Sequence, residues 1–215
     1  GIFDNLRKVL VYLLADAFAE ILLIVVGLVL GWPLPLLAVQ ILWINLVSDG
    51  FPYLALTVEP KEEGLLDRKP IGKNVKILNK EMLWLIVTIS TVAGVMTLGV
   101  FGWYYFILEK SLELSRTLAF TMLGVNSLFY VFSSRSLSKP IWKVNFFQNK
   151  WLILGVMAGM VMQLLAVYTP FLQKVFRTVP LGINEIGLVV AGSLLLMVMV
   201  EMVKGVFLHK EIGKR

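Results

Sequence analysis

Six long apolar stretches dominate this 215-residue chain and limit the folds that it can adopt. A helix of about 20 apolar residues crosses the roughly 30 Å hydrocarbon core of a bilayer, so each stretch is long enough to span a membrane. The sequence therefore predicts an all-α integral membrane protein, a bundle of six transmembrane helices. The expected spans are residues 9–30, 34–58, 82–108, 116–134, 151–171 and 183–208, of which 116–134 is the most polar.

The composition excludes an ordinary soluble enzyme. Hydrophobic residues make up 58% of the chain and charged residues only 16%, whereas soluble domains are about 45–50% apolar and about 25% charged. The net charge of +6 is expected in loops at the membrane surface, so the predicted partner is the lipid bilayer and not nucleic acid. Because cysteine is absent, disulfides and thiolate metal sites are excluded.

Basic residues are distributed unevenly between the two sides of the predicted bundle. Six spans place both termini on one side, and that side carries 16 of the 20 Lys and Arg residues. Positively charged loops remain in the cytoplasm, so both termini are predicted to be cytoplasmic. The chain then divides into residues 1–58 with the first two helices, a charged cytoplasmic loop at 59–81, and residues 82–215 with four further helices and a basic tail.

Ionisable and amide side chains lie deep in the first two predicted spans. Each ionisable group there costs about 2.5–3.5 kcal/mol on insertion scales, so it requires an explanation. At about 1.5 Å per residue, Glu20 lies about 16 Å from one boundary, and Asn45 and Asp49 lie about 16 and 22 Å from the other. The short turn at 31–33 makes the two helices antiparallel neighbours. Glu20, Asn45, Ser48 and Asp49 are therefore expected at overlapping depths.

The second span is predicted to be broken near Gly50/Pro52. Pro52 has no N–H, which frees the carbonyl oxygen of Ser48, and Gly50 lets the backbone open. Carboxylate, amide, hydroxyl and free carbonyl oxygens are the ligands that hard cations prefer. Membrane Asn and Ser residues can also simply bond a neighbouring helix, and Gly/Pro pairs can simply kink one. For the two acids at mid-depth, we favour a site for a cation or a proton.

Three further residues are weaker candidates for this site. Asp16 precedes Glu20 by one helical turn and suits either an entry path or a structural hydrogen bond. Asn126 and Ser127 of the fourth span could add oxygens, with a structural role equally open. Gly155 and Gly159 form a small-xxx-small pair that indicates close helix packing. No catalytic or cofactor-binding residue is predicted.

The segment QILWINLVSDGFP at 40–52 resembles the sixth transmembrane helix of type II P-type cation-transporting ATPases, whose signature reads close to LLWxNLVTDGxP. The resemblance continues in IFDNLRK at 2–8, GWPLPL at 31–36 and LTVEPKEEGLLDRKP at 56–70. It covers about residues 1–72, and the other four spans match in number, length and orientation. The chain thus resembles the carboxy-terminal membrane half of such a pump, helices five to ten, and we expect it to be part of a longer protein.

The resemblance implies a metal site made by Glu20, Asn45, Ser48 and Asp49. It implies Ca²⁺ as the transported ion with proton counter-transport, ahead of Mn²⁺, monovalent cations or protons, in a bacterial plasma membrane. Ala17 stands where sarcoplasmic-reticulum-type calcium pumps have Asn, and Ser127 stands roughly where they have an eighth-helix Glu. One of their two calcium sites is therefore expected to be depleted, and Asp16, the neighbour of Ala17, could compensate for the lost ligands.

The family couples cation movement to ATP hydrolysis through an aspartyl-phosphate, and this chain lacks the residues for that step. It contains no DKTGT sequence, TGE loop, nucleotide-binding domain or fourth-helix proline-glutamate motif. ATP and Mg²⁺ are therefore expected to act only through other domains of the parent pump, a translocase. The expected partners are its phosphorylation domain and its N-terminal membrane helices.

Two other functions are compatible with a polar membrane bundle. An ATP-independent secondary cation transporter or channel with the same broken helix would need a second interrupted polar helix in a matching position. The spans after residue 116 show none. A membrane scaffold without transport is disfavoured by the two acids, Glu20 and Asp49, at mid-depth.

Overall fold

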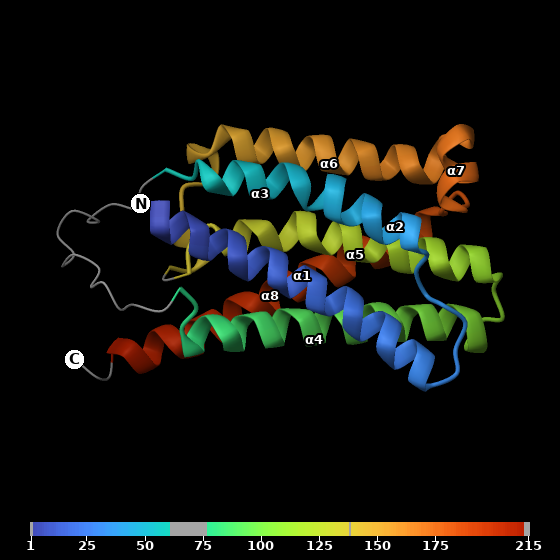
Figure 1. Cartoon of the computed structure of the whole chain (residues 1–215), viewed down its shortest axis with the longest axis horizontal. Coiled ribbons are helices and arrows are strands. Elements are labelled where there is room, and N and C mark those ends of the chain that lie inside the picture. The colour runs from blue at the N-terminus through green and yellow to red at the C-terminus, as the bar shows by residue number, and fades with distance from the viewer. Residues whose placement is uncertain (1, 61–76, 138, 213–215) are drawn as a thin grey trace.

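The computed structural model describes residues 2–60, 77–137 and 139–212, and within these ranges the regular structure is entirely helical. Six helical segments are long and apolar enough to cross a membrane. This confirms the predicted all-α bundle of six spans. Figure 1 shows them side by side, with the start of the first helix and the end of the last at the same end of the bundle. The segments are Ile2–Val29, Ala38–Thr57, Lys80–Ile107, Leu112–Ser134, Lys150–Tyr168 and Ile183–Val206.

The helices of the first half begin with α1 (Ile2–Val29). The second span consists of α2 (Ala38–Trp43), the π-helix η1 (Ile44–Ser48) and α3 (Gly50–Thr57). The third consists of α4 (Lys80–Gly102) and a second π-helix, η2 (Trp103–Ile107). The remaining elements are α5 (Leu112–Ser134), the 3₁₀-helices η3 (Ile141–Lys143) and η4 (Phe146–Gln148), α6 (Lys150–Tyr168), α7 (Pro170–Phe176) and α8 (Ile183–Ile212).

A tight turn joins the first two spans, as predicted. The backbone N–H of Trp32 donates to the carbonyl of Gly27 at 2.9 Å, and Gly31 has a φ of 69°. A left-handed residue just after a helix is a common way to end it, and glycine adopts this conformation without strain. The chain therefore reverses at once, and α1 and the second span become antiparallel neighbours.

The helix α5 lies at the centre of the bundle. Of its membrane-length stretch, 89% is buried inside the protein, against 28% for each of the last two spans. This explains why the most polar span is tolerated. The hydroxyl groups of Thr117 and Thr121 donate to carbonyl oxygens one turn earlier, at 2.7 and 2.8 Å, so they need no partner from lipid.

Glycines on α6 allow its close contact with α3 and α5. A Cβ added to Gly155 would lie 3.1 Å from the carbonyl oxygen of Phe51, and one added to Gly159 would lie 2.7 Å from the Leu128 side chain. Small residues let membrane helices approach in this way. The predicted packing role of the glycine pair is confirmed.

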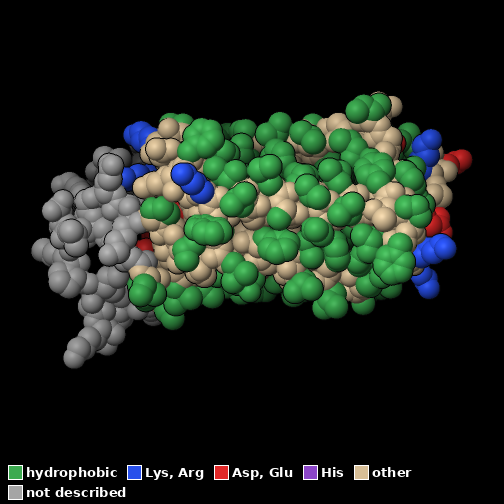
Figure 2. Space-filling model, turned by 90° about the horizontal axis from the view of Figure 1, so that it is seen from above, with side chains coloured by type: hydrophobic (Ala, Val, Ile, Leu, Met, Phe, Trp, Pro, Cys, Tyr) green, Lys and Arg blue, Asp and Glu red, His purple; other side chains and the backbone are tan. Residues whose placement is uncertain are grey.

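Hydrophobic side chains cover the long sides of the molecule. Figure 2 shows them along the whole visible flank, with Lys, Arg, Asp and Glu gathered at the two ends. Leu42 and Leu46, for example, are 69% and 71% exposed. Such a surface is suited to lipid or to other membrane helices. Of the predicted 59–81 loop, residues 61–76 lie outside the described residues.

Candidate cation site

The structure brings Glu20 of α1 against Asn45 of the second span. The amide nitrogen Nδ2 of Asn45 donates to both carboxylate oxygens of Glu20, at 3.0 and 2.9 Å. It also lies 3.0 Å from the carbonyl oxygen of Ile41. Glu20 is only 6% exposed, whereas Asn45 lies at the surface of the described bundle. An acid and an amide from the two spans thus form one side of the candidate site.

The carboxyl groups of Asp16 and Asp49 form the deeper part of this site. Both residues are buried, and Asp49 is completely inaccessible. Neither carboxylate oxygen of Asp49 has a hydrogen-bond partner, and Oδ2 of Asp16 has none. Asp16, Tyr12 and Ser127 are polar neighbours of the Asp49 carboxylate. Burial of two neighbouring carboxylates is costly, and a cation or protons at this pair would lower that cost.

Ser48 connects the site to two other helices. Its carbonyl oxygen accepts a hydrogen bond from the Tyr12 hydroxyl at 3.4 Å. The α-helical donor to that oxygen would be the backbone nitrogen of Pro52, which carries no hydrogen. The hydroxyl group of Ser48 donates to Oε1 of Gln163 on α6 at 3.4 Å, so in this conformation it is turned toward α6.

The predicted helix break takes the form of a π-turn directly before Gly50. The Asp49 N–H donates to the Ile44 carbonyl at 2.9 Å, which is five residues back, and α-helical bonding resumes when Tyr53 N–H donates to the Asp49 carbonyl at 2.9 Å. The span is therefore interrupted near Gly50/Pro52 while its chain stays helical. Short π segments inside α-helices are frequent at functional sites.

The fourth span contributes one of its two candidates to this cluster. Ser127 lies beside Asp49, and its hydroxyl group donates to the Gly124 carbonyl at 3.0 Å. Asn126 instead accepts a hydrogen bond from the Ser193 hydroxyl of α8 at 2.8 Å. Successive residues of an α-helix point about 100° apart, so the two side chains face different neighbours.

Three residues near the site, Tyr12, Gln163 and Tyr130, were not predicted from the sequence. Gln163 bonds Ser48, as described, and Tyr130 donates from its hydroxyl group to the Tyr12 carbonyl at 2.8 Å and neighbours Asp16. Gln163 is an amide in the middle of an apolar span, and such a residue is expected to bond another helix. That signal was present in the sequence. The position of Tyr130 was not marked by any comparable pattern.

Acidic side chains alone do not make up a metal centre here. In the described part of the chain, no three His, Cys, Asp or Glu side chains are close enough together to hold a metal ion. A cation bound between α1 and the second span would therefore also use amide, hydroxyl or carbonyl oxygens. Ca²⁺ is commonly bound by such mixed oxygen sets.

The fold and this cluster define an integral membrane protein that encloses acids and an amide between its first two spans. Residues 33–206 match the family model described as "Cation transporting ATPase, C-terminus", and the chain belongs to this family. The comparison confirms the resemblance to the carboxy-terminal membrane part of P-type ATPases.

Named relatives come from bacteria and mammals. The chain is 35% identical over 193 residues to the "Calcium-transporting ATPase" of Bacillus subtilis (strain 168), covering 90% of this chain and 22% of that protein. It is 34% identical over 186 residues to the "Probable cation-transporting ATPase F" of Mycobacterium tuberculosis (strain ATCC 25618 / H37Rv), covering 86% and 20%. It is 32% identical over 204 residues to the "Calcium-transporting ATPase type 2C member 2" of Mus musculus, covering 95% and 22%. The chain spans about a fifth of the length of these relatives.

Proposed function

We propose that this chain is the cation-binding transmembrane portion of an ATP-driven P-type pump, and that the pump exports Ca²⁺ in exchange for protons. The observation that carries the proposal is the buried Asp16–Asp49 pair, in which both carboxylate oxygens of Asp49 and Oδ2 of Asp16 have no hydrogen-bond partner. The names of the Bacillus subtilis and mouse relatives support Ca²⁺ as the transported ion. ATP and Mg²⁺ act in this scheme through domains outside this chain.

The proposed ligands are Glu20, Asn45, Ser48 and Asp49. The Asn45 nitrogen faces Glu20 in this conformation, which leaves its Oδ1 oxygen for a cation. The Ser48 hydroxyl would have to rotate away from Gln163, whereas its carbonyl oxygen already lies near Tyr12. Because Ca²⁺ takes about six to eight oxygen ligands, this set needs additions, and Asp16 and Ser127 lie nearby.

The surface around Asn45 supports N-terminal membrane helices of the parent pump as the partner. Asn45 is exposed together with Leu42 and Leu46, at a spacing that places all three on one face of the second span. A polar ligand is costly on a lipid-facing surface. Further helices packed there would both cover the amide and complete the coordination sphere.

Transport follows from a change in the geometry of these oxygens. In a state open to the cytoplasm they hold the ion, and movement of α1 against the interrupted second span separates them and releases it outward. After release, Asp16 and Asp49 would repel each other as bare carboxylates, so we expect protons to replace the ion. The excess of Lys and Arg at the end that holds both termini supports a cytoplasmic location for that end, here of a bacterial plasma membrane.

The ATP-independent transporter receives less support. Its second interrupted helix would correspond to η2, which is formed by Trp103, Tyr104, Tyr105, Phe106 and Ile107. This π segment carries no acid or amide, and it lies at the end of its span. It therefore does not reproduce the polar break of the second span, and inverted-repeat transporters need such a counterpart.

The experiment is uptake of radioactive Ca²⁺ by vesicles reconstituted with a pump that contains this chain. We expect Asp49→Asn to lower the apparent Ca²⁺ affinity by at least about tenfold, because even the mutation of an outer-shell partner of a metal ligand costs about that much. The control is Glu113→Gln, which neutralises an exposed acid in the first turn of α5. Unchanged affinity in Asp49→Asn would refute the ligand assignment. Uptake of Mn²⁺ or Na⁺ without Ca²⁺ would refute the proposed ion.

A further inference from the structure

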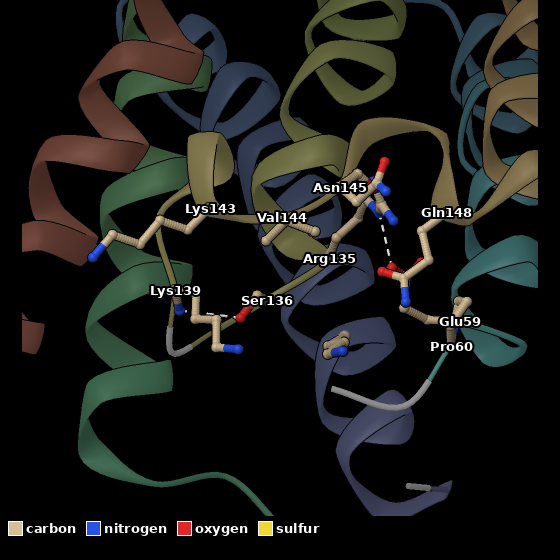
Figure 3. Close-up of a pocket in the computed structure, with 10 residues that line it drawn as sticks. Glu59, Pro60, Arg135, Ser136, Lys139, Lys143, Val144, Asn145 and Gln148 are labelled. Carbon is tan, nitrogen blue, oxygen red and sulfur yellow. Dashed lines mark hydrogen bonds and ion pairs between the residues drawn. The ribbon is translucent and has the colours of Figure 1, made fainter. Parts of the chain in front are cut away.

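A polar cavity of about 200 Å³ lies at the end of the bundle where α1 begins and α8 ends. We refer to it as the basic cavity, because its described lining contains Lys8, Arg135, Lys139 and Lys143 and one acid, Glu59. Figure 3 shows Glu59, Arg135, Lys139 and Lys143 around the cavity. The cation site needs positive charge, whereas this cavity is suited to an anion.

Glu59, the one acid among the described residues of the lining, is already paired. Oε1 of Glu59 accepts a hydrogen bond from Nε of Arg135 at 2.8 Å, and its Oε2 accepts one from the Asn149 amide. Both carboxylate oxygens therefore have donors, and Glu59 holds the Arg135 guanidinium in place. The charge of Glu59 offsets that of Arg135, and Lys139 adds a further positive charge to the described lining.

Arg135 retains donors for a further acceptor. Its Nη1 donates to the carbonyls of Asn145 and Phe146 at 3.0 and 3.1 Å, but its buried Nη2 has no partner. Arg135 is only 2% exposed, so bulk water does not readily supply an acceptor for its Nη2. A guanidinium edge with unused N–H groups in a basic cavity matches the oxygens of a phosphate group.

Lys139 and Lys143 differ in direction, although they belong to the same loop. Figure 3 shows the Lys143 side chain extending away from Arg135 and Glu59, so this residue lines the cavity through its nearer atoms. Lys139 lies beside Ser136, whose hydroxyl oxygen accepts the Lys139 backbone N–H at 3.0 Å. Lys139 is therefore the lysine of this loop that can contribute its charge to an anion in the cavity.

Aromatic side chains place this cavity at the level of lipid headgroups. Trp142, Phe147 and Trp151 are 73%, 72% and 69% exposed, and they occupy the same loop and the start of α6. Tryptophan in particular is enriched at membrane–water interfaces. We propose that the basic cavity binds the phosphate group of an anionic phospholipid, with Arg135 and Lys139 as its main contacts.

The test is lipid binding by the purified protein in detergent, measured by native mass spectrometry with added phosphatidylglycerol or phosphatidylcholine. Wild-type protein is expected to bind phosphatidylglycerol more tightly. Lys139→Ala should weaken this binding about tenfold, the effect of losing one charge-assisted contact. Lys139→Arg should keep it, and Lys143→Ala, which removes the same charge from the same loop, should leave it nearly unchanged.

Three results would overturn the proposal. The first is equal binding of the two lipids by the wild-type protein. The second is an equal loss in Lys139→Ala and Lys143→Ala, since it would indicate a diffuse surface charge and not the cavity. The third is displacement of phosphatidylglycerol by millimolar inorganic phosphate, which would identify free phosphate as the ligand.

Discussion

The buried ion pair between Arg135 and Glu59 makes a quantitative prediction about stability. The two side chains meet at 2.8 Å and are 2% and 4% exposed. Arg135→Met removes the partner of a buried carboxylate and two hydrogen bonds to loop carbonyls. Breaking a buried pair from one side costs about 3–5 kcal/mol, because the remaining charge is left uncompensated. We expect the free energy of unfolding to fall by this amount.

Equilibrium unfolding in mixed lipid–detergent micelles measures this loss. The matched control is Arg116→Met, which removes a partly exposed guanidinium with one bond, to the Leu34 carbonyl at 2.9 Å, and should cost about 1 kcal/mol. The double variant Arg135→Met/Glu59→Met should recover most of the stability, since a buried pair replaced by apolar residues is often neutral. A loss in Arg135→Met no larger than in the control, or additive effects in the double variant, would refute this reasoning.

The remaining stability predictions concern the second span and α6. Tyr12→Phe should cost about 0.5–1.5 kcal/mol in unfolding experiments, because the Ser48 carbonyl loses its hydroxyl donor, and no loss would contradict that bond. Gly155→Ala should destabilise by about 1–3 kcal/mol, since its Cβ would press on the Phe51 backbone. Gly187→Ala, which has open space around the added Cβ, should stabilise α8 by up to about 1 kcal/mol, and shifts of equal sign would contradict the packing argument.

The fold was predictable because lipid leaves few alternatives. Apolar length alone identified six spans, and the short turn at 31–33 fixed the first two as antiparallel neighbours. Counting residues inward from the two membrane boundaries then placed Glu20 and Asn45 at overlapping depths, and the structure shows the two in contact. These inferences use only distances along the chain and one local turn, so a single sequence is sufficient for them.

The orientation of other polar groups depends on helices that are distant in sequence. The Ser48 hydroxyl bonds Gln163 on α6, and Asn126 bonds Ser193 on α8. The order in which α5, α6 and α8 pack around the first two spans is not encoded in apolar length. The central position of the most polar span, Leu112–Ser134, could not be predicted for the same reason. Its polar residues bond within the bundle, and the hydropathy pattern does not show where their partners lie.

The buried acids of the described residues fall into two groups, and the difference bears on function. At the end of the bundle where the termini lie, Glu59 pairs with Arg135, and Glu201 accepts from Lys204 at 2.9 Å. These acids have cations of the protein beside them, as buried charges that serve stability require.

Between α1 and the second span, by contrast, Asp16, Glu20 and Asp49 have no Lys or Arg partner within the described parts of the chain. If these acids only filled space, apolar residues of similar size would pack there at lower cost. Carboxylates without a cationic partner are unfavourable inside a membrane bundle. We propose that their missing partner is exchangeable, and a transported cation that alternates with protons would meet that requirement. This is why the absence of an internal counter-charge supports the pump more strongly than the mere presence of acids in the membrane.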